Sequence, residues 1–245
     1  MADLIDWQMA IECIPSIVEV FPVTLVMLVG SLFWGLLIAF ATAIFQIYKI
    51  PVARQISAAY VDFIRGTPQI LQLFLVYYAI PSILQKIGID VSSFTKMFFV
   101  IIAFSVNVGA YLSETLRGAF LSVDCAQKEA AYSIGMTSVQ VFCYIVLPQA
   151  LKLAIPSMGN SIISLLKETS LAFNIGMIDM MGRAKTIGNV THRFFEIYIA
   201  VALVYWGCSI LLEFVFLWLE NRLDKEGRQA HGKQRRNTVP DFSIP

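Results

Sequence analysis

The stretch EAAYSIGMTSVQVFCYIVLP, residues 129–148, decides how this chain is organised, because it interrupts a sequence made mostly of long apolar runs. It opens with a glutamate, carries Gly135 near its middle and ends in Pro148. Glycine adopts positive φ angles freely, so Gly135 favours the end of one helix and a turn into the next. Cys125 to Ser133 and Ser138 to Ile145 are therefore predicted to form a helical hairpin. Pro148 is predicted to end the second segment and to serve as an early residue of the following helix.

The composition indicates a membrane protein. Of the 245 residues, 58% are hydrophobic and 14% are charged, whereas an ordinary soluble domain is about half apolar and about a quarter charged. The formal net charge of +1 gives no overall attraction to nucleic acid, so no nucleic-acid partner is expected. The four cysteines form no CxxC pair and no zinc-ligand spacing, so neither a disulfide framework nor a metal site is predicted.

Five segments are long and apolar enough to cross a hydrocarbon core of about 30 Å, so the predicted fold is an all-α, polytopic membrane protein. The spans are expected at about residues 20–48, 52–80, 96–121, 150–171 and 194–219, with the loop at 122–149 between the third and fourth. The second span is predicted as one helix that begins near Val52 and is ended by Pro81. Residues 20–220 would form a single transmembrane domain. Residues 1–19 precede it, and the polar tail at 221–245 is predicted to be disordered beyond the last helical turn.

The basic residues give the expected orientation. The segment before the first apolar run is acidic and has no Lys or Arg, unlike a signal peptide, so an uncleaved first span with the N-terminus outside is predicted. The loop at 122–149 and the tail are then cytoplasmic. The basic tail can contact anionic membrane lipid, although a solvated tail that fixes the orientation is the favoured interpretation. The side assigned to the cytoplasm holds Lys49, Arg54, Arg65, Arg117, Lys128, Lys152 and the basic residues of the tail.

The spacing of residues in the opening stretch resembles the EAA motif of permease subunits in bacterial ABC importers. The residues that match are Glu129, Ala130, Ala131, Gly135, Ile145, Leu147 and Pro148. The stretches RGTPQILQLFLVYY (65–78), AYLSETLRG (110–118) and LPQALKLAIPSMGNSIISLLKETSLA (147–172) resemble the polar-amino-acid branch of that family, the histidine, glutamine and cystine type. The likeness covers about residues 20–220. One departure is Ala126, where the family often has glycine before Gln127, and it affects only the local backbone.

The resemblance implies a type I ABC importer permease fold in the bacterial inner membrane. Such a subunit dimerises with a second permease chain, identical or homologous. It docks a coupling helix on a cytoplasmic ABC ATPase dimer and receives substrate from an extracytoplasmic binding protein. This chain has no GxxxxGK[ST] motif, so it is expected to be no enzyme and to hold no cofactor, while ATP and Mg²⁺ bind the partner ATPase. From periodicity alone, the hairpin fits an amphipathic linker on the membrane surface equally well. The predicted coupling residues are Glu129, Ala130, Ala131, Gly135, Leu147 and Pro148.

Charges within the apolar segments predict a substrate site, because an ion at bilayer depth costs from about 3 to more than 10 kcal/mol. Polar residues of the third span recur at i, i+4 and i+7 and share one helix face. In the fourth span, a Lys-Glu pair suits the carboxylate and ammonium of an amino acid, and Asn160, Ser161 and Ser164 lie upstream. The resemblance implies that these segments line the translocation cavity. The alternative is a structural ion pair between Lys167 and either Glu114 or Glu168. The predicted substrate-binding residues are Asn107, Tyr111, Glu114, Lys167, Glu168, Thr169 and Ser170.

Residues 178–206, particularly GRAKTIG and RFFEIYIA, resemble cystine permeases more than arginine or glutamine permeases, so L-cystine is the expected substrate. Arg65 and the segment at 66–68 are interpreted as helix packing or gating near the cytoplasmic mouth rather than as ligand contacts. The alternative function is a self-sufficient, ion-driven secondary transporter. An odd number of spans without a repeat counts against it. A membrane enzyme ranks last, since no nucleophile–base set, HExxH motif or pair of catalytic carboxylates is found.

Overall fold

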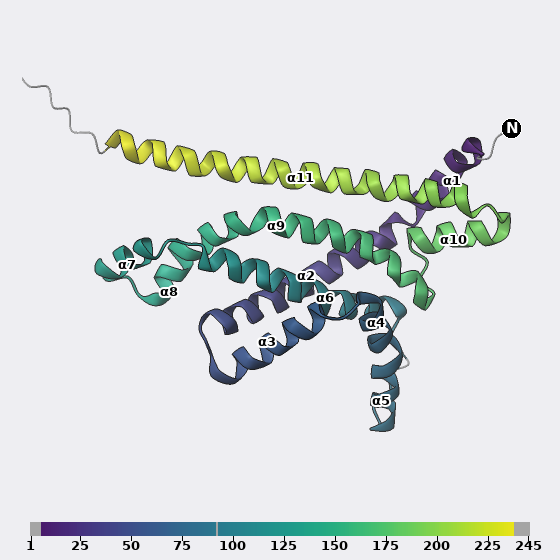
Figure 1. Cartoon of the computed structure of the whole chain (residues 1–245), viewed down its shortest axis with the longest axis horizontal. Coiled ribbons are helices and arrows are strands. Elements are labelled where there is room, and N and C mark those ends of the chain that lie inside the picture. Colours follow the sequence, from purple (N-terminus) through teal and green to yellow (C-terminus); the bar gives the residue numbers. More distant parts are fainter. Residues whose placement is uncertain (1–5, 92, 238–245) are drawn as a thin grey trace, which may run out of the picture.

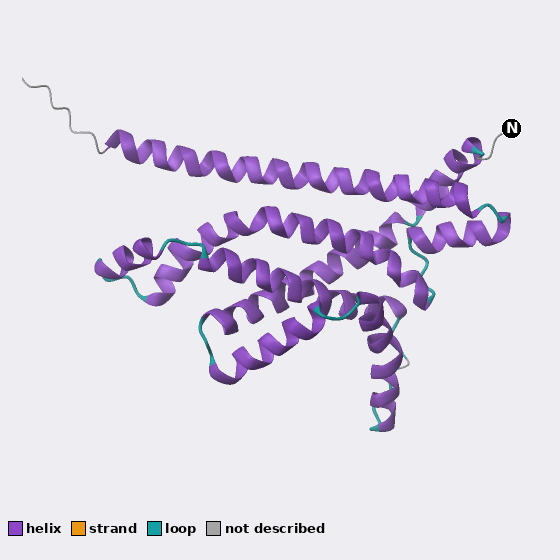
Figure 2. Cartoon of the chain, viewed as in Figure 1, coloured by secondary structure: helices purple, strands orange, loops and turns teal. Residues whose placement is uncertain are grey.

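The computed structural model describes residues 6–91 and 93–237 as helices joined by short loops, with no strand in those ranges (Figures 1 and 2). Four helices are long and apolar enough to cross a membrane, or five if a sharply bent pair counts as one span. The elements are α1 (Trp7–Glu19), α2 (Phe21–Ile47), α3 (Pro51–Arg65), α4 (Gln69–Phe74), η1 (Leu75–Ala79), α5 (Ile80–Lys86), α6 (Lys96–Leu121), α7 (Cys125–Ser133), α8 (Ser138–Val141), η2 (Phe142–Val146), α9 (Leu147–Glu168), η3 (Thr169–Ile175), α10 (Met180–Thr191) and α11 (Phe194–Asn237). The prediction of an all-α membrane protein with about five spans is confirmed.

The centre of the fold is the pair α2 and α6, which pack along each other. Glycines let the two backbones approach closely where the helices cross. A Cβ atom on Gly35 would overlap Val108 Cγ1, and one on Gly109 would lie 3.2 Å from the carbonyl oxygen of Gly35. Fully buried side chains such as Phe104 and Leu112 fill the same interface. α6 is therefore the most enclosed helix and the support for its neighbours.

The remaining long helices add to one side of this pair: α9 packs on α6, and α11 packs on α9. A second, smaller core lies where α1 and α10 meet the beginning of α11, around Ile17, Met180 and Ile197. Figure 1 shows α10 and α1 at one end of the molecule and α7 and α8 at the other. The two ends of the long helices thus carry different accessory helices.

The second predicted span is not one straight helix. α3 and the segment from Gln69 to Lys86 meet at an angle of 110°. Pro68 has the extended backbone (φ −63°, ψ 135°), and Gly66 is the C-cap of α3. Proline has no N–H and disfavours a helical residue before it, so the helix ends here and starts again in a new direction.

Two prolines that are predicted to stop helices do not stop them. Pro81 follows η1 and Pro148 follows η2, and in both cases the helix continues, to Lys86 and through Glu168 respectively. The ring of a proline clashes with the carbonyl four residues earlier, here that of Tyr77 or Tyr144. Each of those carbonyls lies inside the π-helical turn, where the wider i→i+5 pattern accommodates the ring. Residues 138–175 consequently form one continuous helical path.

The last helix is longer than predicted. α11 continues to Asn237, well into the tail for which the sequence predicts disorder after the final turn of the fifth span. In Figure 1 it passes along the whole molecule and ends level with α7. Residues 1–5 and 238–245, which belong to the predicted terminal segments, lie outside the described residues.

Candidate functional site: a coupling hairpin and a polar cavity between two spans

The hairpin of α7 and α8 is defined by hydrogen bonds at its turn. α7 ends with Gly135 at φ +85°. The Gly135 N–H donates to Tyr132 O at 3.0 Å, and the Met136 N–H donates to Ala131 O at 3.2 Å. This pair of bonds is the Schellman motif, which satisfies carbonyls at a helix end. The turn predicted at Gly135 is therefore observed, and the left-handed backbone explains why a glycine stands there.

α8 starts directly after this turn with a capping box. The Gln140 N–H donates to Thr137 Oγ1 at 3.4 Å, and the Thr137 N–H donates to Gln140 Oε1 at 2.8 Å. At the other end of the hairpin, Asp124 caps α7 by accepting from the Ala126 N–H at 2.9 Å. Because the N-terminus of each of its two helices is capped by a side chain, the hairpin is a structured element and not a loose linker.

The hairpin exposes apolar side chains. Ile134 and Val139 are 80% and 71% exposed, and Glu129 and Ala130 are exposed on α7. Ala131 is buried, Leu147 packs on the main core, and Pro148 is exposed. The predicted coupling residues thus divide into an outward-facing part and a part that anchors the hairpin to the spans. Clustered exposed apolar residues mark surfaces that another protein or the membrane covers.

A polar cavity of about 250 Å³ lies between α6 and α9. It is lined by Asn107, Val108, Tyr111, Asn160, Ser161, Ser164 and Glu168. We refer to it as the central cavity, because Asn107 is near the middle of α6. It contains one carboxylate, two amides and three hydroxyl groups, so it can hold an ammonium and donate hydrogen bonds to a carboxylate.

Two glutamines after the bend of span two hold the polar residues of this cavity. With its amide nitrogen facing α9, Gln69 donates to Glu168 Oε2 at 2.6 Å and to Oε1 at 3.1 Å. Gln72, which is 5% exposed, accepts from Asn107 Nδ2 at 2.8 Å. Neither glutamine is among the residues that the sequence predicts for the site. The sequence feature that could have predicted them is a pair of amide side chains three residues apart in an apolar run just after Pro68. This spacing places both glutamines on one helix face.

Three of the seven predicted substrate residues line the central cavity: Asn107, Tyr111 and Glu168. Lys167 does not; it is exposed, and within the part of the chain that the structure describes no ion pair joins it to Glu114 or Glu168. The hydroxyl groups of Thr169 and Ser170 donate to backbone carbonyls in the preceding turn, at 2.6 Å each. Successive helical residues point about 100° apart, and at this position Glu168 faces the cavity while Lys167 is exposed outside it.

Glu114 lines a different cavity, of about 330 Å³, next to α3. Both of its oxygens accept from Arg117, Oε1 from Nε at 3.0 Å and Oε2 from Nη2 at 2.7 Å. Arg65 Nη1 lies 3.9 Å from Glu114 Oε2. The third predicted residue of the span-three face is thus separated from the other two, and it already has a charged partner.

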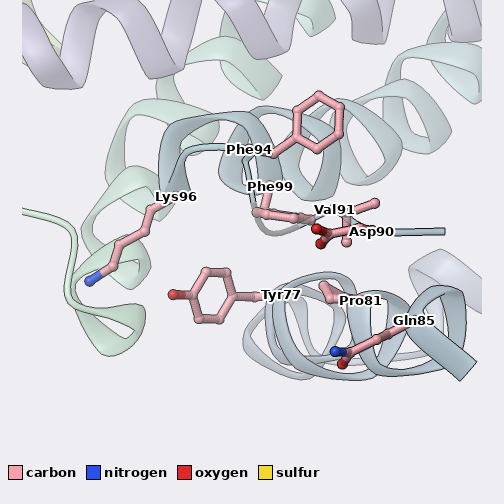
Figure 3. Close-up of a pocket in the computed structure, with 8 residues that line it drawn as sticks. All are labelled: Tyr77, Pro81, Gln85, Asp90, Val91, Phe94, Lys96 and Phe99. Atoms are coloured by element: carbon pink, nitrogen blue, oxygen red, sulfur yellow. The ribbon is translucent and has the colours of Figure 1, made fainter. Parts of the chain in front are cut away.

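A further cavity of about 250 Å³ is formed at the start of α6 and the end of span two (Figure 3). Figure 3 shows Tyr77, Pro81 and Gln85 on one side of the cavity and Phe94, Phe99, Val91 and Asp90 on the other, with the Lys96 ammonium directed away from Asp90. That ammonium donates to Gly176 O at 3.1 Å. This cavity lies at the opposite end of α6 from the coupling hairpin and shares no residue with the central cavity.

The fold and the cavities describe a helical membrane transporter subunit with a protruding hairpin at one end. The sequence profile of the family described as binding-protein-dependent transport system inner membrane component matches residues 35–225. The chain belongs to this family, which confirms the resemblance based on the EAA motif. It is an amino-acid ABC transporter permease subunit, a transporter component, and a multi-pass inner membrane protein.

Individual relatives agree with this membership. The chain is 41% identical over 225 residues to the L-cystine transport system permease protein TcyL of Bacillus subtilis (strain 168), covering 92% of this chain and 94% of the relative. It is 31% identical over 218 residues to the glutamine transport system permease protein GlnP of Escherichia coli (strain K12), covering 89% and 97%. A solved structure described as an amino acid ABC transporter with histidines superposes with a TM-score of 0.78 at 29% identity. It covers 89% of this chain and 99% of that one.

Proposed function

We propose that this permease subunit imports a zwitterionic amino acid, with L-cystine as the leading candidate, and that a separate ATPase drives the transport. The central cavity carries this proposal. In it, Glu168 would bind the α-ammonium, while Asn107, Tyr111 and the serines of α9 would donate to the α-carboxylate. Burial strengthens the contact made by Asn107, because little water competes for its amide, whereas Tyr111, Asn160 and Ser164 are exposed.

Several features support coupling through α7 and α8. Both helices of the hairpin are N-capped by side chains, and the hairpin projects from one end of the spans and exposes Ile134 and Val139. A rigid, partly apolar protrusion suits a cleft on a cytoplasmic ATPase dimer. ATP and Mg²⁺ would bind there, since this chain carries no GxxxxGK[ST] motif. The family also implies a second permease subunit and an extracytoplasmic binding protein as partners.

The proposed orientation places the hairpin and the C-terminal end of α11 in the cytoplasm and the N-terminus outside. The positive-inside rule supports it, because the loops on the hairpin side hold most of the basic residues. The structure is consistent with this orientation, because the two parts proposed to be cytoplasmic, the hairpin of α7 and α8 and the end of α11, lie at the same end of the molecule (Figure 1). Cysteine labelling from each side of sealed vesicles tests this, with Cys125 of α7 and Cys143 of η2 as native exposed thiols.

The preference for L-cystine rests on similarity. TcyL, whose name states L-cystine transport, is 41% identical, and the matching residues extend over nearly the whole chain. The GlnP relative, named for glutamine, is 31% identical. The cavity itself recognises groups that every α-amino acid carries, so its geometry supports the class, and the similarity supports the choice within the class.

The proposal is tested by reconstituting the chain with its ATPase and binding protein and measuring uptake of radiolabelled L-cystine and L-glutamine with and without ATP. Equilibrium binding to the purified complex without the binding protein then tests the cavity. Glu168→Gln is expected to weaken binding about tenfold or more, because the loss of one charge-assisted contact of about 1.5 kcal/mol corresponds to that factor. Lys167→Met, the neighbouring substitution outside the cavity, is the matched control and should change binding much less.

Two results would overturn the proposal. Equal binding by the Glu168→Gln and wild-type complexes would remove the central cavity as the substrate site. Full accumulation by this chain alone, driven by an ion gradient without the ATPase, would favour the secondary-transporter alternative instead.

A further inference from the structure

One face of α3 supplies five of the eight residues that line the cavity containing Glu114, and α2 and α6 supply the others. The residues of α3 that line it recur at helical spacing, while Val52, Ile56 and Phe63 point to the opposite face and are 69%, 65% and 58% exposed. α3 thus turns its charges towards α6 and its apolar side outwards, as expected of a helix beside lipid. We call this space the arginine cavity; its lining residues are Gln46, Arg54, Ala58, Val61, Asp62, Arg65, Glu114 and Arg117.

Several charged side chains of the arginine cavity have hydrogen-bonding groups that contacts within the described residues do not satisfy. Arg117 satisfies both oxygens of Glu114, at 3.0 and 2.7 Å, which leaves that pair neutral. Arg65 is 3.9 Å from Glu114, beyond hydrogen-bond distance. Arg54 and Asp62 take part in no ion pair within the described ranges. Two guanidinium groups and one carboxylate therefore keep free hydrogen-bonding capacity.

The arginine cavity adjoins the central cavity through one aromatic contact. Tyr111 lines the central cavity, and the guanidinium carbon of Arg65, which lines the arginine cavity, lies 5.6 Å from the centroid of its ring. Such a cation–π contact contributes about 0.5 to 1 kcal/mol at an exposed site, so it is weak enough to open and close. Going along α6 from Asn107 to Arg117, the chain passes from the central cavity to the arginine cavity and on towards the coupling hairpin.

We propose that the arginine cavity is a second amino-acid site, which receives the substrate after the central cavity on the side of the coupling hairpin. Arg54 and Arg65 hold the α-carboxylate, for which planar guanidinium groups have matching geometry. Asp62 holds the α-ammonium. This inference rests on the proposed function, because it assumes that an amino acid passes through the central cavity.

The mixed charge favours an amino acid over an anionic lipid headgroup. A phosphate would approach the two arginines but would also meet the carboxylate of Asp62, whereas an amino acid brings an opposite charge to each group. The volume, about 330 Å³ against about 250 Å³ for the central cavity, leaves room for a small solute. Lipid would contact the exposed apolar face of α3, which lies opposite the arginine cavity.

The test is equilibrium binding of radiolabelled L-cystine, and separately L-glutamine, to the purified complex of this chain with its ATPase. We expect about two molecules of the transported probe per permease chain. Arg54→Gln and Asp62→Asn should each reduce this to about one, and Arg54→Lys should keep the second site with weaker affinity. Glu168→Gln removes the other, central molecule. Association with the ATPase on purification shows that each variant is folded.

The outcomes separate the two proposals. A single bound molecule that survives Arg54→Gln and Asp62→Asn but is lost in Glu168→Gln overturns the second site and leaves the proposed function intact. No binding of either probe by the wild type overturns both. Loss of co-purifying anionic lipid in Arg54→Gln, with unchanged amino-acid binding, identifies a lipid headgroup site and likewise overturns the proposal.

Discussion

Asn107 on α6 donates its side-chain amide to Gln72 on α4 at 2.8 Å, and this one bond joins the wall of the central cavity to the bend of span two. The Gln72 amide nitrogen donates in turn to Ile64 O at 2.8 Å, to Thr67 O at 3.1 Å and to Thr67 Oγ1 at 2.9 Å. The end of α3 leaves carbonyls without helical partners. The buried Gln72 amide donates hydrogen bonds to these carbonyls, so the bend and the cavity depend on the same side chain.

The first prediction concerns this side chain. Gln72→Leu should lower the free energy of unfolding by about 2 to 3 kcal/mol, because it leaves buried polar groups on both sides without a partner. The measurement is the unfolding midpoint of the purified chain in detergent. Gln85→Leu, at an exposed position of α5, is the control. Equal midpoints for Gln72→Leu and the wild type would show that the network is not important for stability.

The turn of the coupling hairpin gives a second prediction. At φ +85°, Gly135 tolerates no other residue without strain of about 1 to 2 kcal/mol, although nothing lies within 4 Å of its Cβ position. Gly135→Asp and Gly135→Ala should therefore disturb the hairpin and uncouple ATP hydrolysis from uptake, while the spans remain inserted. Gly118→Ala, on α6 with similar open space, should behave as wild type. Normal uptake per ATP in both Gly135 variants would contradict the coupling role.

The crossing of α2 and α6 gives a third prediction. Gly35→Ala places a methyl group against Val108 Cγ1 and 3.3 Å from Ser105 O, and overpacking of this kind costs about 1 to 3 kcal/mol. The double variant Gly35→Ala with Val108→Ala should recover part of this loss, because the second change removes the clashing methyl group. Gly207→Ala on α11, with nothing within 4 Å, should not destabilise the protein. Additive losses in the double variant would exclude the contact as the cause.

A fourth prediction concerns pH. Asp179 is the N-cap of α10, accepting from the Gly182 N–H at 2.8 Å, and Tyr205 donates to its other oxygen at 3.1 Å. Burial nevertheless raises the pKa of Asp179 from 3.8 to about 6, and these hydrogen bonds oppose the rise without cancelling it. The folded state therefore binds the proton at a higher pH than the unfolded chain does. Protonation stabilises the fold, and the free energy of unfolding should fall as the pH rises from about 4 through 6.

The size of this effect is on the order of 3 kcal/mol, since the pKa rises by about two units and each unit corresponds to about 1.4 kcal/mol. Asp179→Asn keeps a capping side chain but cannot ionise, so its unfolding midpoint should vary less between pH 5 and pH 7.5 than that of the wild type. Asp124→Asn, which changes an exposed N-cap at the other end of the molecule, serves as the control. Parallel pH profiles for wild type and Asp179→Asn would contradict the assigned pKa.

The sequence predicts local features of this protein well, because they depend on neighbouring residues. The apolar runs indicate an all-α membrane fold, and the glycine between two short polar segments predicts the turn at Gly135. The two prolines at positions 81 and 148 show the limit of such rules. A proline forbids the regular i→i+4 bond but not a π-helical turn, and the energy of that choice is set by packing around the whole helix.

The grouping of the polar residues was decided by the tertiary structure. Asn107, Tyr111 and Glu114 share one face of α6, yet the bend of span two places α3 beside Glu114 and α4 beside Asn107, so one face serves two cavities. Lys167 and Glu168 are neighbours in sequence and point in different directions. Composition and spacing determined that this chain crosses the membrane and carries an EAA hairpin. Which side chains meet depends on the angle of 110° between α3 and the segment from Gln69 to Lys86. That angle is set by packing against α6 and not by the local sequence.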